Sequence, residues 1–197
     1  MVSWRTGPAL DAALRAALAA PDVDEVVLVN HGNPLSVEAR LDALAADEPK
    51  LQLVHSGANL GFAAGCNLGA GVARGDRLFF LNPDTVLPPG AAARLTETGE
   101  LQPSPWIVGA RVVHPDGREQ RGGRRGLLTP VSALTTFTGL SRLPGMKRLL
   151  PDIHREHEPL PPEDVAMPVV SGAAFMIDRK GYERLGGFDE GYFLHVE

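Results

Sequence analysis

Two kinds of hydrophobic pattern follow each other along the first half of the chain. Short continuous apolar runs predict buried strands at residues 2–4, 26–29, 51–55 and 78–81. Apolar residues three to four positions apart predict helices at residues 8–20 and 37–46, and a stretch of glycines and other small residues from residue 59 opens a third helix that runs to residue 74. A strand–helix–strand order repeated in this way predicts an α/β fold with a mostly parallel central sheet flanked by helices, as in Rossmann-like proteins.

The pattern is less regular in the second half. We expect a short helix at residues 91–95, a strand at 106–113 leading into a hairpin turn at 114–117, and a final strand and helix at 169–177 and 179–185. These elements supply a small antiparallel part. Prolines and glycines interrupt residues 126–162, which we expect to form an irregular excursion over the mouth of the site. Residues 1–197 are expected to be a single domain.

Composition narrows the classes of function. A formal net charge of −5 and a pI near 5.7 argue against a nucleic-acid partner. The single cysteine, Cys66, excludes an internal disulfide framework. No apolar run approaches the length of a spanning helix, so a cytoplasmic protein is expected. Leucines and basic residues between Leu127 and Leu150 leave open a peripheral contact with the inner face of a membrane.

The run Leu78–Leu81 stops abruptly at Asn82-Pro83-Asp84. Ligands of open α/β sheets bind at the carboxyl ends of the strands. A divalent cation bound to a nucleotide needs only one or two carboxylates, because phosphate and water oxygens complete its coordination. Asp84 is therefore a candidate ligand for Mg²⁺ or Mn²⁺. The alternative is that Asp84 only ends the strand and caps the next turn.

A glycine-rich stretch from Asn59 to Gly71 opens the third predicted helix. Small residues and backbone amides at a helix start suit phosphate or ribose, although the spacing is neither that of a Walker loop nor that of a Rossmann fingerprint. Close packing of the helix on the sheet is the alternative for its alanines and glycines. His31 and His55 lie at strand ends and are expected to be polar residues at the rim of the cleft. The arginines at positions 118, 121, 124 and 125 are expected to form a solvated arm of the hairpin.

Four separated motifs together resemble family 2 glycosyltransferases, and among them the rhamnosyltransferase-like branch. They are residues 59–69, 80–84, 171–175 and 186–197. The resemblance implies the GT-A nucleotide-diphospho-sugar transferase fold, a divalent cation and inversion at the anomeric carbon. It also implies a dTDP- or UDP-sugar donor, such as dTDP-rhamnose, and a glycan or lipid-linked glycan acceptor in bacterial cell-wall or surface polysaccharide synthesis.

The resemblance also assigns site residues. Asp84 matches the metal-binding carboxylate, and Asn30 stands where the family has an acidic contact to the nucleotide base. The residues expected to bind the nucleotide-sugar are Asn30, Asn59, Gly61, Phe62, Asn67, Asn82, Gly172 and Ala173.

Three carboxylates are candidates for the catalytic end of the site: Asp189, Glu190 and Glu197. In the family, the catalytic base is an aspartate directly after the glutamate that Glu197 matches, so Asp189 and Glu190 are expected to shape the site and the chain to be incomplete at its carboxyl end. Two other functions remain open at this point, a non-catalytic nucleotide- or glycan-binding relative and a sugar nucleotidyltransferase.

Overall fold

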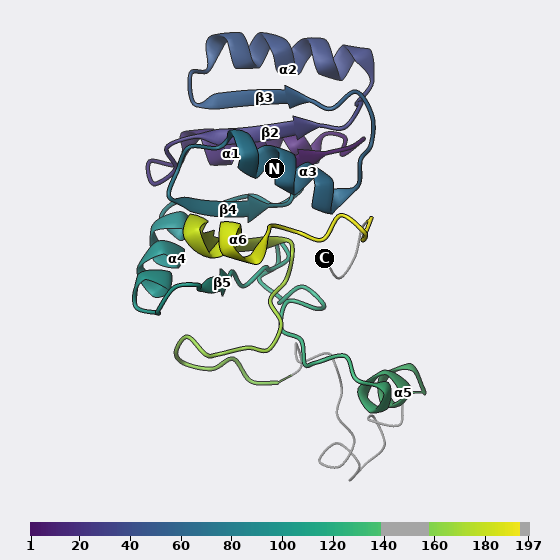
Figure 1. Ribbon diagram of the computed structural model, residues 1–197, viewed down its shortest axis with the longest axis vertical. Coiled ribbons are helices and arrows are strands. Elements are labelled where there is room, and N and C mark those ends of the chain that lie inside the picture. The colour runs from purple at the N-terminus through teal and green to yellow at the C-terminus, as the bar shows by residue number, and fades with distance from the viewer. Residues whose placement is uncertain (139–157, 194–197) are drawn as a thin grey trace. The chain divides into compact units, whose positions relative to one another are not determined.

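The computed structural model of the protein describes residues 1–138 and 158–193, and its chain divides into two compact units (Figure 1). The first unit comprises Met1–Val108 together with the chain from Gly172 onward. The second unit comprises Gly109–Ser171. It contains the segment that the sequence predicts to be an irregular excursion.

The first unit begins with a parallel sheet. Its strands, in the order β1-β2-β3, are β1 (Val2–Ser3), β2 (Val26–Asn30) and β3 (Leu51–His55). Strand β2 pairs with both neighbours, Val2 lying opposite Val29 and Val26 opposite Leu51. The helices that connect and follow these strands are α1 (Ala9–Ala19), α2 (Leu35–Asp47) and α3 (Phe62–Val72). The α/β alternation predicted from the hydrophobic pattern is confirmed.

The predicted hydrophobic positions form the main core of the first unit. Leu10 and Leu14 of α1 pack with Leu28 of β2 and Leu41 of α2, and each of these side chains is about 1% exposed or less. Helix α3 lies on the sheet through small residues: a Cβ at Gly69 would be 3.2 Å from Cγ2 of Val29. Close approach of α3 to β2 explains why its sequence is so rich in glycine and alanine.

A second sheet completes the first unit, with strand order β4-β6-β5. Strand β4 (Arg77–Leu81) pairs antiparallel with β6 (Ala174–Asp178), and β5 is Ile107–Gly109. Helices α4 (Ala91–Glu100) and α6 (Arg179–Leu185) belong to the same unit. In Figure 1 the arrows of β2, β3 and β4 point the same way, so their carboxyl ends meet at one edge. The expected antiparallel part is thus built on β4 and β6.

Several predicted boundaries were wrong. The strand expected at 106–113 is limited to β5, and the strand expected from residue 169 begins only at Ala174, after a turn at Gly172 and Ala173. Helix α4 continues five residues beyond Leu95, because its polar residues form an exposed face that hydrophobic spacing does not mark.

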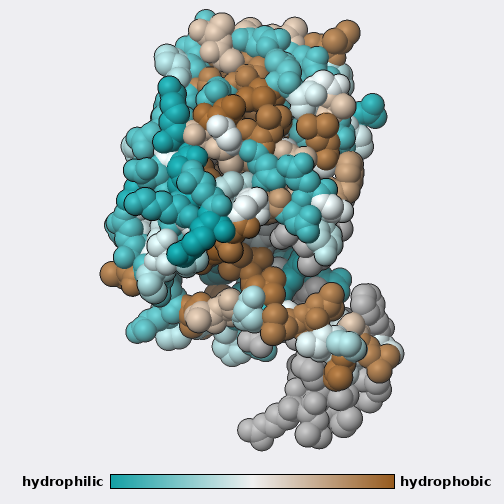
Figure 2. All heavy atoms as spheres, viewed as in Figure 1, coloured by the Kyte–Doolittle hydropathy of each residue, from teal (hydrophilic) through white to brown (hydrophobic). Residues whose placement is uncertain are grey.

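The second unit contains a hairpin and a helix. The His114 N–H donates to the Arg118 carbonyl at 2.8 Å, as the predicted turn requires. Arg124 pairs with Glu119 at 2.9 Å, and both side chains are largely buried, so the arginine arm is in part a structural ion pair and not wholly solvated. Helix α5 (Pro130–Thr138) lies where an irregular segment was expected. Figure 2 shows apolar residues on the surface of this unit, and Leu127, Leu128, Val131 and Leu134 are exposed. No described helix is long and apolar enough to cross a bilayer.

Candidate functional site at the carboxyl ends of the strands

The carboxyl end of β4 lies beside the start of β6. The Asn82 N–H donates to the Ala173 carbonyl at 2.8 Å, and the Thr85 N–H donates to the Asn82 carbonyl at 3.1 Å. This turn carries Asp84 out to an exposed position. A Cβ at Gly172 would meet no atom within 4 Å, so open space adjoins the same turn. The fold therefore brings the turn that carries Asn82 and Asp84 next to Gly172 and Ala173 at the start of β6, and their roles in binding stay a prediction.

Asp84 suits a cation that arrives with phosphate. Within the described part of the chain, no three His, Cys, Asp or Glu residues lie close enough to form a metal cage. Mg²⁺ and Mn²⁺ complexed to nucleotides do not need such a cage, because one carboxylate plus phosphate and water oxygens is enough. Among the described residues, the Asp84 carboxylate has no hydrogen-bond or ion-pair partner that would compete with a cation. Its surroundings thus fit the role.

The turn after β2 is held by Asn30, which is completely buried. Its Oδ1 accepts from the N–H and the Nδ2 of Asn33, at 3.1 and 2.7 Å. Its Nδ2 lies 2.8 Å from Glu38 Oε1 and 2.9 Å from His55 Nδ1. All of these hydrogen bonds are to other residues of the chain. Asn30 can therefore contact a nucleotide base only if one of them is broken.

His31 was expected at the rim, and that expectation was wrong because its side chain is 1% exposed. Nδ1 lies 3.3 Å from Asn59 Oδ1, and Nε2 has no hydrogen-bond partner in the described structure. A Cβ at Gly65 would lie 2.7 Å from Cε1 of His31, so glycine makes room for the ring. Burial lowers the pKa of His31, and the bond to Asn59 opposes this only in part. His55, by contrast, is exposed and pairs with Asp42 at 2.8 Å.

Acid is expected to destabilise the protein through His31. A histidine whose folded-state pKa lies below its ordinary value of about 6.5 binds fewer protons folded than unfolded, so stability falls as pH drops below about 6.5. The loss is as much as about 1.4 kcal/mol for each pH unit in that range. Urea unfolding at pH 7.5, 6.5 and 5.5 measures it. Replacing His31 with Gln should flatten the slope, while replacing the exposed His114 with Gln should not. Equal slopes in the two variants would remove His31 as the cause.

The start of α3 is joined to the end of the described chain. Gly61 has φ 90°, and a Cβ there would lie 2.7 Å from the Phe193 carbonyl oxygen. The Phe62 N–H donates to that same carbonyl at 2.8 Å. Asn59 Oδ1 accepts the Gly61 N–H at 3.0 Å. Asn59, Gly61 and Phe62 are therefore placed together, at the point where residues 188–193 pass the helix start.

Asn67 forms a clasp between α3 and the segment after α6. Its Oδ1 accepts from the Tyr182 hydroxyl and from the Phe188 N–H, the latter at 2.9 Å. Its Nδ2 donates to the Phe188 carbonyl at 3.0 Å and to Glu190 Oε1 at 2.8 Å. All four hydrogen-bonding capacities of the amide are used. The observed contacts of Asn67 are internal, and none is left for a sugar or a phosphate.

The candidate catalytic carboxylates make local bonds. Asp189 Oδ1 accepts from the Gly191 N–H at 2.9 Å, and Glu190 accepts from Asn67. Both residues are exposed. Glu197 lies outside the described residues. The hydrogen bonds of Asp189 and Glu190 hold the segment around Gly191 and Asn67, and the expectation that these two residues shape the site stays a prediction.

An aromatic cluster that sequence analysis did not find supports this edge. Phe80 of β4 lies 5.1 Å from Phe175 of β6 and 5.1 Å from Phe188, ring centre to ring centre. Phe62 and Tyr182 complete it, and burial raises the Tyr182 pKa to about 12. The cluster packs the end of β4 against the segment that Asn67 holds. A cluster of residues that lie far apart in the chain leaves no periodic pattern in the sequence. The signal that could have indicated it is that Phe62, Phe80, Phe175 and Phe188 each belong to a different one of the four motifs.

The parallel α/β unit, its antiparallel β4–β6 pair and the site at the strand ends define the GT-A class of glycosyltransferase folds. The chain belongs to glycosyl transferase family 2, whose sequence profile matches residues 1–186. The resemblance to this family that the sequence motifs indicated is thereby confirmed.

Relatives and solved structures agree with this assignment. The chain is 27% identical, over 218 aligned residues, to the N-acetylglucosaminyl-diphospho-decaprenol L-rhamnosyltransferase of two Mycobacterium tuberculosis strains, CDC 1551 / Oshkosh and H37Rv. All of this chain is covered, but it spans only 66% of the length of those relatives. Among solved structures, it resembles the mannosyltransferase PcManGT from Pyrobaculum calidifontis in complex with GDP-Man and Mn²⁺. The TM-score is 0.61 at 18% identity, covering 96% of this chain and 46% of that one.

Proposed function

We propose that this chain is the donor-binding catalytic domain of a metal-dependent, inverting glycosyltransferase. It moves a sugar from a nucleotide-diphospho-sugar to a hydroxyl group of a bacterial cell-wall or surface glycan. The observation that carries the proposal is the Asp84 carboxylate, which is exposed and has no partner among the described residues, at the turn that Asn82 ties to Ala173, in a chain of glycosyl transferase family 2.

The finer identity of the substrates draws on the relatives. The named activity of the mycobacterial relatives supports rhamnose as the sugar and a lipid-linked N-acetylglucosamine as the acceptor. A dTDP- or UDP-sugar remains the proposed donor, as the sequence resemblance implies. The exposed apolar residues Leu127, Leu128, Val131 and Leu134 support a peripheral contact with the membrane in which such an acceptor resides. A domain working at the cytoplasmic face is consistent with this arrangement.

The residues present support a separate role for each part of the site. In inverting transfer the acceptor oxygen forms a bond to the anomeric carbon, the bond from that carbon to the diphosphate oxygen breaks, and a carboxylate takes the acceptor proton. Asp84 would hold the cation, and a cation bound there would supply positive charge against the diphosphate. Gly172 and Ala173 leave room for the sugar ring. Asn59, Gly61 and Phe62 border the nucleotide, with Asn30 and Asn82 fixing the two turns.

The base is proposed to be a carboxylate of the segment after Phe193, for which Glu197 is the candidate in this sequence. Asp189 and Glu190 order the chain that leads to it, because each is tied to a local hydrogen bond. Asn67 contributes by holding the same segment against α3. Asp189, Glu190 and Asn67 are therefore proposed to affect the transfer reaction indirectly, by positioning this segment.

A transfer assay tests the function. The protein is incubated with Mn²⁺, dTDP-rhamnose and a polyprenyl-diphospho-N-acetylglucosamine acceptor. Release of dTDP with a rhamnose-bearing lipid product is the expected result. Pyrophosphate release from dTTP and a sugar phosphate would instead show a nucleotidyltransferase. Nucleotide binding without any transfer, across a panel of sugars and acceptors, would show a non-catalytic binding relative.

A further inference from the structure

A buried histidine ring contacts Asn59, one of the residues proposed to border the nucleotide. His31 directly follows β2, and its backbone N–H donates to the Ser3 carbonyl at 2.9 Å. The ring is 1% exposed, and it occupies the space that Gly65 of α3 leaves by having no Cβ. Burying a polar ring costs free energy unless its nitrogens are paired. The surroundings of each nitrogen therefore indicate what the ring contributes.

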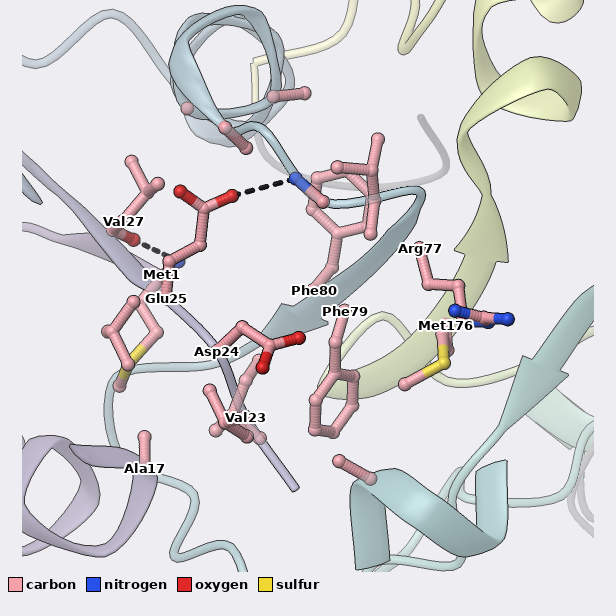
Figure 3. A pocket seen from close by; sticks show the side chains of 18 of the residues that line it. Met1, Ala17, Val23, Asp24, Glu25, Val27, Arg77, Phe79, Phe80 and Met176 are labelled. Atoms are coloured by element: carbon pink, nitrogen blue, oxygen red, sulfur yellow. Dashed lines mark hydrogen bonds between the residues drawn. The ribbon is translucent and has the colours of Figure 1, made fainter. Parts of the chain in front are cut away.

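The Nε2 atom of His31 faces apolar surroundings. It has no hydrogen-bond partner in the part of the chain that the structure describes. A Cβ at Gly65 would lie 2.8 Å from Nε2 and 2.8 Å from Cγ1 of Val2, so Val2 is close to the same edge of the ring. Val2 and Gly65 line the groove of about 490 Å³ between β2 and β4 shown in Figure 3, whereas His31 does not line it. Within the described residues, the polar contact of the ring is thus made through Nδ1.

Nδ1 of His31 bonds to the side-chain oxygen of Asn59. The distance from Nδ1 to Oδ1 is 3.3 Å, and the same oxygen accepts the Gly61 N–H at 3.0 Å. A backbone N–H can only donate, so the Asn59 atom that it meets is the oxygen of the amide and not the nitrogen. Nδ1 faces this acceptor and therefore carries the proton of the neutral ring, while Nε2 carries the lone pair. Burial lowers the pKa of His31, which favours this neutral form.

The amide nitrogen of Asn59 is left available for a ligand. Two donors occupy both lone pairs of Oδ1 and hold the plane of the amide in one orientation. Nδ2 has no hydrogen-bond partner among the described residues, and it is not one of their buried unpaired atoms. Asn59 is partly exposed, so both N–H groups of Nδ2 are accessible beside the start of α3. A group with two free donors recognises an oxygen acceptor.

We propose that His31 is a positioning residue for the nucleotide: its Nδ1–H holds the Asn59 amide so that Nδ2 donates to an oxygen of the bound nucleotide. The inference rests on the proposed function, because it names a contact within the same donor site. The acceptor is a carbonyl oxygen of the base or a phosphate oxygen, since both accept from a neutral amide. An amide held in one orientation before binding loses less conformational freedom when the ligand arrives. His31 itself does not touch the nucleotide.

Isothermal titration with dTDP and Mn²⁺ tests this in four proteins: the parent chain, the His31→Leu and Asn59→Ala variants, and the variant that combines them. Losing the amide donors is expected to weaken dTDP binding about tenfold. Losing the group that orients the amide should weaken it about fivefold. The combined variant should bind as Asn59→Ala does, because His31 then has no amide to orient. Two losses that multiply to about fiftyfold would overturn the proposal.

A loss of affinity is separated from a loss of stability by a control in the core. Leucine has roughly the volume of histidine and removes the unpaired Nε2, so His31→Leu is expected to keep the melting temperature within about 3 °C of the parent. His31→Phe keeps a ring without a donor and should show the same loss of affinity. Leu14→Ala in the main core should lower the melting temperature and leave dTDP affinity unchanged. Equal losses of affinity in the Leu14 and His31 variants would contradict a positioning role.

The free protein gives a second readout, which a merely structural histidine would not fix. In a ¹⁵N–¹H correlation spectrum of the imidazole groups at pH 7.5, His31 should show a protonated Nδ1 and an unprotonated Nε2. The opposite tautomer would rule out the proposal, because Nδ1 would then be an acceptor and could not bond to the oxygen of Asn59.

Titrations with thymidine identify the acceptor. A loss of the same factor for thymidine and for dTDP in Asn59→Ala would support a carbonyl oxygen of the base, and a loss confined to dTDP would support a phosphate oxygen. A parent chain that binds no nucleotide would overturn the proposed function. A parent chain that binds dTDP, with a His31→Leu variant of equal affinity, would overturn this inference alone.

Discussion

Replacing Asp84 with Asn is expected to abolish the contribution of Mn²⁺ to nucleotide binding. The variant keeps the size of the side chain and removes the charge that a divalent cation requires. We expect the affinity for dTDP in the presence of Mn²⁺ to fall on the order of 100-fold, to the value measured without metal. Isothermal titration with and without Mn²⁺ measures this. Because Asp84 is exposed, the melting temperature should stay within about 1 °C of the parent.

Asp47 provides the matched control. It is an exposed aspartate at the end of α2, away from β4 and β6. Replacing Asp47 with Asn makes the same change in net charge and should leave the Mn²⁺ effect intact. A loss of metal dependence in both variants would indicate a general charge effect. Retention of metal dependence in the Asp84 variant would remove Asp84 from the role of ligand.

Replacing Asn67 with Ala is expected to be the most destabilising substitution in the candidate site. It removes four hydrogen bonds at once and leaves the Phe188 N–H and carbonyl and the Tyr182 hydroxyl without their partner. Each partly buried polar group left unpaired costs about 1 to 3 kcal/mol. We expect a total loss of about 3 kcal/mol or more, measured as the free energy of unfolding in urea. The segment around Phe188 should also become sensitive to proteolysis.

Replacing Tyr182 with Phe separates the clasp from the aromatic cluster. The ring stays in contact with Phe80 and Phe188, and only the hydroxyl that donates to Asn67 is lost. A loss near 1 kcal/mol is expected. In the double variant the two losses should be less than additive, because they share one bond. Full additivity, or an Asn67 variant as stable as the parent, would contradict the clasp.

The sequence predicted those features that depend on local pattern. Hydrophobic spacing placed α1 through Leu10 and Leu14, and continuous apolar runs placed β2, β3 and β4 to within a residue or two. The abrupt end of the run at Asn82 located the turn that presents Asp84. Periodicity and strand ends are properties of neighbouring residues, which is why they can be predicted from the chain alone.

Features that depend on residues far apart in the chain were not predictable in this way. The amide of Asn67 was interpreted as a ligand for the donor, yet its partners lie more than a hundred residues later, at Tyr182, Phe188 and Glu190. His31 was expected at a rim, but the space left by Gly65 allows its burial. A polar residue at the end of a helix or strand can either bind a substrate or hold two segments of the chain together. The local sequence is the same in both cases.

The central claim is that Asp84 makes nucleotide binding depend on a divalent cation. A calorimetric titration of the chain with dTDP and with UDP, each with Mn²⁺ and with EDTA, tests it most directly. The predicted result is binding with Mn²⁺ that is lost in EDTA and lost in the D84N variant. Equal binding with and without the metal, or no binding of either nucleotide under any condition, would contradict the claim.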